Sequence, residues 1–74
     1  MIFKSLDLHG KQHDEVEILV TNFITLNDLP VHIIVGNSKR MQDLVGAIIH
    51  HHGLFYHYQR WTNPGCFVVM KSQH

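Results

Sequence analysis

The stretch VHIIVGNSKRMQDLVGAIIHHHG, residues 31–53, decides the fold, because it passes from a strand through a tight turn into an amphipathic helix. Its β-branched start predicts a buried parallel strand over residues 31–35. Gly36, Asn37 and Ser38 form a turn that supplies N-cap candidates for the helix. Gly53, the last residue of the stretch, ends the helix. The apolar stripe that gives the helix its buried face consists of Met41, Leu44, Val45, Ile48 and Ile49.

The N-terminal part has the same strand-then-helix pattern. Residues 2–8 predict a short strand with Leu6 and Leu8 on one face. Residues 14–17 carry three carboxylates, which suit the positive end of a helix dipole. The helix that follows is ended by Asn27, Asp28 and Pro30, and its apolar face consists of Val16, Leu19, Val20, Phe23 and Ile24.

Two strands complete the chain. Residues 55–61 are rich in aromatics and predict a third strand, residues 62–65 a turn, and residues 66–71 a fourth strand. Right-handed crossovers place both helices on one sheet face, and the short turn makes the last strand antiparallel. Residues 1–74 are therefore predicted to form one stand-alone β-α-β-α-β-β domain. It is a two-layer α/β sandwich with a four-stranded mixed sheet and one open sheet face.

Composition sets broad bounds on function. The 74 residues have a formal net charge of zero and an apolar fraction of 45%, and they include one cysteine, Cys66. No apolar run approaches the roughly 20 residues of a membrane span, and a lone cysteine allows neither an internal disulfide nor a thiolate zinc site. We therefore expect a cytoplasmic protein. All acidic residues precede position 44, so the C-terminal part is mildly basic.

The loops after the first two strands are the expected site, since ligands of open α/β sheets bind beyond the carboxyl ends of parallel strands. In the first loop, Asp7 and His9 are two residues apart, and an extended backbone points both to one side. A carboxylate beside an imidazole suits acid–base work on a phosphodiester. The alternative is that Asp7 merely accepts hydrogen bonds from loop amides.

In the second loop, Gly36, Asn37 and Ser38 present backbone N–H groups at a helix N-terminus, which favours a phosphate. Lys39 and Arg40 follow in the first helical turn, where cations oppose the helix dipole. This pattern indicates anion binding, and the alternative is a pair of solvated surface cations.

Strand alternation places Tyr56, Tyr58 and Arg60 on one side of the third strand. On an uncovered sheet face this side could stack bases, and otherwise it is core packing. The chain has eight histidines, but consecutive histidines such as residues 50–52 point about 100° apart on a helix and cannot share one metal ion. A structural role is favoured for them.

Several of these segments resemble the Smr (small MutS-related) domain family. Leu6-Asp7-Leu8-His9-Gly10 resembles the Leu-Asp-x-His-Gly signature of that family, residues 31–36 its second strand, and residues 63–69 its last hairpin. The resemblance covers nearly the whole chain in order and implies the same β-α-β-α-β-β fold. It departs in the second loop, where Val35 and Ser38 replace a polar residue and a second glycine.

The resemblance implies a nucleic-acid-binding domain that cuts RNA or nicks DNA, with a divalent cation such as Mg²⁺ as a possible cofactor. The expected catalytic residues are Asp7, which orients His9 or holds a metal, and His9, the general acid or base. The alternatives are a non-catalytic RNA- or DNA-binding module and an interaction domain for a larger protein. The expected nucleic-acid contacts are Gly10, Gly36, Asn37, Ser38, Lys39, Arg40, Tyr56, Tyr58 and Arg60.

Overall fold

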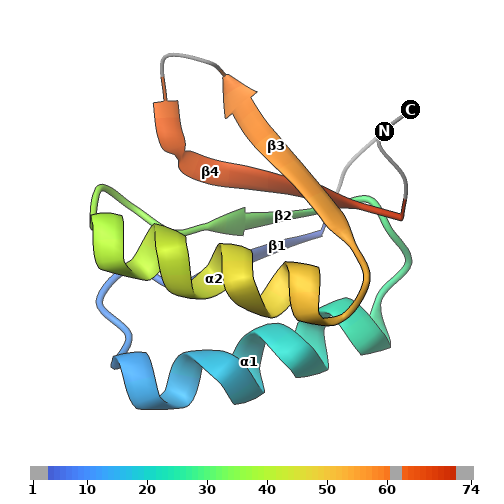
Figure 1. The fold of residues 1–74 in the computed structure, drawn as a ribbon, viewed down its shortest axis with the longest axis horizontal. Helices are drawn as coiled ribbons and strands as arrows, with labels where there is room; N and C mark the ends of the chain where they lie inside the picture. Colours follow the sequence, from blue (N-terminus) through green and yellow to red (C-terminus); the bar gives the residue numbers. More distant parts are fainter. Residues whose placement is uncertain (1–3, 61–62, 72–74) are drawn as a thin grey trace.

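The computed structural model describes residues 4–60 and 63–71, and its helices and strands follow the predicted order (Figure 1). The elements in chain order are β1 (Ser5–Asp7), α1 (His13–Leu26), β2 (Val31–Ile34), α2 (Lys39–His51), β3 (Phe55–Arg60) and β4 (Asn63–Met70). None of the helices in this part of the chain has the length and apolar character to cross a membrane.

The four strands form one mixed sheet in the order β1-β2-β4-β3. β1 is parallel to β2, and β4 is antiparallel to both β2 and β3. The last strand therefore lies between β2 and β3, so that β3 runs parallel to β2 without touching it. The predicted mixed sheet with an antiparallel last strand is confirmed. The sequence leaves open which strand occupies the centre.

Both helices cover the same face of the sheet, as predicted (Figure 1). Strand alternation directs Ile33, Phe67 and Val69 to this face, where each is at most 1% exposed. They pack with the apolar stripes of the helices, which include Val16, Val20, Val45 and Ile49. On the other face of β4, Cys66 and Val68 are also buried, at 8% exposed each. The helices and the sheet thus share one apolar core.

Several boundaries differ from those predicted, and β1 and β4 end one residue early, at Asp7 and Met70. β4 begins at Asn63, three residues earlier than expected, because Asn63 pairs with Arg60 across a register shift and extends the hairpin ladder into the predicted turn. β2 ends at Ile34, one residue earlier than predicted, because the chain turns at Gly36, whose φ is +75° and whose N–H shares the carbonyl of Gly65 with the N–H of Val35. Residues 2–3 of the strand expected at residues 2–8 lie outside the described part. So do residue 61, the end of the expected third strand, and residue 62, the start of the expected turn.

Candidate functional site

The loops after β1 and β2 meet at one rim of the sheet, as the sequence predicts. The N–H of Leu8 donates to the carbonyl of Ile34 over 2.8 Å, which extends the β1–β2 pairing to the start of both loops. Beyond it, Cδ2 of His9 lies 3.9 Å from the position that a Cβ on Gly36 would occupy. Gly36 has a φ of +75°, a conformation that favours glycine. We call the surface formed by residues 7–11 and 36–40 the rim.

Asp7 holds the backbone of its own loop. Its Oδ1 accepts a hydrogen bond of 2.9 Å from the backbone N–H of His9, and both residues are exposed. Within the described part of the chain, the imidazole of His9 has no hydrogen-bond partner. The carboxylate–imidazole pair considered from the sequence is therefore not formed, and the alternative, a carboxylate bonded to a loop amide, is what the structure shows. The ring of His9 is left free to face a ligand.

The second loop uses one of the N–H groups that were expected to face a phosphate, that of Gly36. The N–H groups of Val35 and Gly36 donate to the carbonyl of Gly65 over 2.7 and 3.1 Å. The hydroxyl of Ser38 accepts from the N–H of Met41 over 3.2 Å, as an N-cap. The expectation that Gly36 offers a free amide is thus wrong, because β4 already occupies it. Among the described residues, the N–H groups of Asn37 and Ser38 donate no hydrogen bond, so free donors begin at Asn37 and continue into the first turn of α2.

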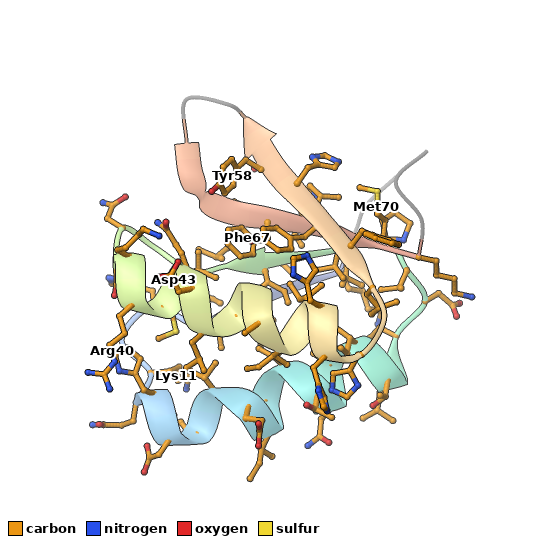
Figure 2. All side chains as sticks on the ribbon, viewed as in Figure 1. Lys11, Arg40, Asp43, Tyr58, Phe67 and Met70 are labelled. Carbon is orange, nitrogen blue, oxygen red and sulfur yellow. The ribbon has the colours of Figure 1, made fainter. Side chains whose placement is uncertain are left out.

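The cations at the rim are not equivalent. Nζ of Lys39 lies 2.7 Å from Oδ1 of Asp43, one turn along α2, and the two side chains form an ion pair. The hydrogen bond and the charge of Asp43 raise the pKa of Lys39 above its ordinary value of 10.5. Arg40 and Lys11 make no such pair with the described residues, and both lie at this end of the molecule (Figure 2). Lys11, which the sequence patterns did not single out, is a free cation at the rim.

The tyrosines of β3 lie on the helix-covered side, so they do not form a stripe on the open face. The ring of Tyr56 stacks on Phe67 with centroids 4.3 Å apart and planes at 17°. Tyr58 makes a looser contact with Phe67, at 5.7 Å and 45°, and is 44% exposed. Tyr56 is therefore a packing residue. The side chain of Arg60, which the sequence places beside them, lies outside the described part.

Metal ligation is not supported by the described residues. They contain no group of three or more His, Cys, Asp or Glu side chains able to hold an ion. Asp7, the expected ligand of a divalent cation, uses its Oδ1 on the loop amide. The consecutive histidines diverge only in part: the ring of His50 lies 5.3 Å from that of Tyr56 and Nε2 of His52 lies 3.2 Å from Oγ1 of Thr21, but the rings of His51 and His52 are 5.6 Å apart, edge to face.

The open face of the sheet carries a hollow that the sequence patterns did not reveal. Its lining includes Ser5, His32, Ile34, Asn37, Gln59 and Cys66. Strand alternation predicts that Gln59 and Tyr58 point to opposite faces of β3. The sheet order then places Gln59 across β4 from β2, so that β2 and β3 can line one hollow. Burial raises the pKa of the Cys66 thiol, which keeps it protonated at neutral pH. We call this depression the outer hollow.

Comparison with protein-family models, with curated proteins and with solved structures found no match for this chain.

Proposed function

We propose that this chain binds RNA through a phosphodiester placed on the rim, and that His9 transfers the proton in its cleavage. The observation that carries the proposal is the proximity of the His9 ring to Gly36, on which a Cβ would lie 3.9 Å from Cδ2 of His9; it brings an unpartnered imidazole beside the start of a second, cation-bearing loop. The resemblance to Smr domains leads to the same proposal from sequence alone.

Binding rests on charge and backbone geometry at the rim. Arg40 and Lys11 are exposed and have no carboxylate partner among the described residues, and the first turn of α2 supplies N–H groups at the positive end of a helix dipole. These groups suit one or two phosphates rather than a long backbone. With two cations neutralising two phosphates, log Kobs should fall with log salt with a slope of roughly −1.4 for a single strand.

Cleavage by one imidazole favours RNA over DNA, because RNA carries its own nucleophile. His9 takes the proton of a 2′-hydroxyl, the 2′-oxygen bonds to phosphorus, and the bond from phosphorus to the 5′-oxygen breaks. The proton then passes from the imidazole to the leaving 5′-oxygen, so the reaction consumes neither water nor a redox partner. General acid–base catalysis of this kind contributes about 10²- to 10⁴-fold.

A second candidate, binding without cleavage, is favoured by one specific observation. Asp7 does not contact the imidazole, so no described side chain fixes the tautomer or orientation of His9. In this case the rim holds RNA and releases it intact.

The test compares cutting and affinity in the same samples of structured and single-stranded RNA. His9→Ala should reduce the cleavage rate by about 100-fold or more while changing affinity only slightly. His51→Ala, at an exposed histidine near the far end of α2, is the matched control and should cut like the wild type. Binding without product in the wild type would select the second candidate, and no binding at low salt would refute both.

Asp7 provides a further control on mechanism. Asp7→Asn keeps an oxygen that can accept the N–H of His9, so this variant should retain most of the activity. Asp7→Ala removes the acceptor and should lose activity by loosening the loop. Equal loss in both variants would show that the negative charge of Asp7 is needed, beyond its hydrogen bond to the loop amide.

A further inference from the structure

The outer hollow adjoins the rim on the open face of the sheet. Ile34, His32 and Cys66 belong to two neighbouring strands, β2 and β4, and Gln59 comes from the edge strand β3. At the other end the lining reaches Gly36 and Asn37, the residues that lead from β2 into the rim. One depression therefore connects the sheet surface with the proposed phosphate position.

We propose that the outer hollow binds one unpaired nucleobase of the strand whose phosphate lies on the rim. This inference rests on the proposed function, and it makes a single-stranded segment the substrate class.

The chemistry of the lining fits a base. Ile34 is 37% exposed and Cys66 is 8% exposed, so the floor is an apolar surface on which a flat ring can lie. Asn37 and Gln59 are exposed side-chain amides, and each offers a donor and an acceptor to a base edge. The described lining contains no Asp, Glu, Lys or Arg, which suits an uncharged heterocycle better than a second phosphate.

Continuity with the rim selects the nucleotide next to the bound phosphate. Gly36 takes part in both surfaces, since it lines the hollow and a Cβ built on it would lie 3.9 Å from the ring of His9. A base inside a duplex has its faces covered by stacking and its pairing edge occupied, so only a splayed-out base can enter. Tyr58, the other exposed ring at this end of the sheet, lies on the helix-covered side and cannot form part of this hollow.

The experiment measures the affinities of three probes of equal length: a single-stranded RNA, the same strand with abasic sugars, and an RNA duplex. Wild-type protein should bind the single strand about five- to tenfold more tightly than the abasic strand, the low end of the gain from stacking one base on an aromatic ring, because the floor here is aliphatic. The duplex should bind no better than the abasic strand.

Two variants assign the base preference to the outer hollow. Ile34→Thr keeps a β-branched residue in β2 but makes the floor polar, and Gln59→Ala removes one amide. Each should bring single-stranded and abasic RNA to nearly equal affinity without lowering affinity for the abasic strand. Ile18→Thr is the matched control, because Ile18 is 65% exposed on α1 and lies outside the hollow. It should keep the preference of the wild type.

The outcomes separate this inference from the proposed function. Equal wild-type affinity for single-stranded and abasic RNA would overturn the base site and leave the rim in place. A base preference that survives both Ile34→Thr and Gln59→Ala would move the base elsewhere and also overturn the inference. Failure to bind any of the probes at low salt would refute the rim and the hollow together.

Discussion

Replacement of Gly46 by alanine tests the packing of β3 against α2 most directly. Gly46 is buried in the middle of α2, and a Cβ built on it would lie 2.6 Å from Oη of Tyr56 and 3.1 Å from its Cζ. The ring cannot swing away freely, because it is stacked on Phe67 at 4.3 Å and lies 5.3 Å from the ring of His50. The variant therefore forces either the tyrosine or the helix to move.

Two opposing effects set the change in the free energy of unfolding that Gly46→Ala causes. Alanine in place of glycine stabilises a helix by about 1 kcal/mol, whereas overpacking of a well-filled site costs about 1–3 kcal/mol. The expected net effect of Gly46→Ala is a loss of about 1 kcal/mol in the free energy of unfolding. For a domain of this size, that corresponds to a fall of about 4–8 °C in Tm.

The assay is urea unfolding followed by circular dichroism, applied to a double-mutant cycle. Tyr56→Phe removes the atom nearest to the new methyl group, so Gly46→Ala should be close to neutral in that background. The coupling energy between the two sites should be about 1 kcal/mol. Stabilisation by Gly46→Ala to the same extent in both backgrounds would refute the close approach of Tyr56 to α2.

Two further predictions concern α2 and β3. Ser38→Ala should lower the free energy of unfolding by about 1 kcal/mol, because it removes the hydroxyl that accepts from the N–H of Met41; Ser38→Asp, which restores an acceptor, should recover the loss in urea unfolding. Burial, and then the nearby Tyr58 and Asp43, raise the pKa of Tyr56 above its ordinary 10.0. The unfolded chain then releases this proton at a lower pH than the folded chain, so stability should decline as pH rises through 10, and less so in Tyr56→Phe. A decline of equal size in both proteins would exclude Tyr56 as its source.

Local sequence patterns were sufficient for the elements and for the rim. The apolar stripes at helical spacing define α1 and α2, because only one helix face can be buried. Gly36 and Gly53, with φ of +75° and +73°, lie where glycine turns were predicted. The parallel pairing of β1 and β2 then places the two loops at the same edge, which needs no knowledge of distant contacts.

The partners of the donors at the rim could not be read from the sequence, because they depend on the insertion of β4 between β2 and β3. That insertion brings the carbonyl of Gly65 to the N–H of Gly36 and so removes an amide from the expected phosphate site. It also turns Tyr56 towards α2 and leaves Gln59 on the open face. Alternation along β3 separates these two sides, but which side meets the helices depends on the neighbouring strand.

The sequence by itself thus determined the order of helices and strands, the helix-covered core and the meeting of two loops, since these depend on local periodicity and on the handedness of crossovers. Tertiary structure alone decided the roles of single side chains. It brought the carbonyl of Gly65 to the N–H of Gly36, stacked Tyr56 on Phe67 and left Lys11 and Arg40 unpaired among the described residues. Hydrogen bonds and ion pairs depend on which groups come within about 3 Å of each other, and a linear pattern does not specify such distances.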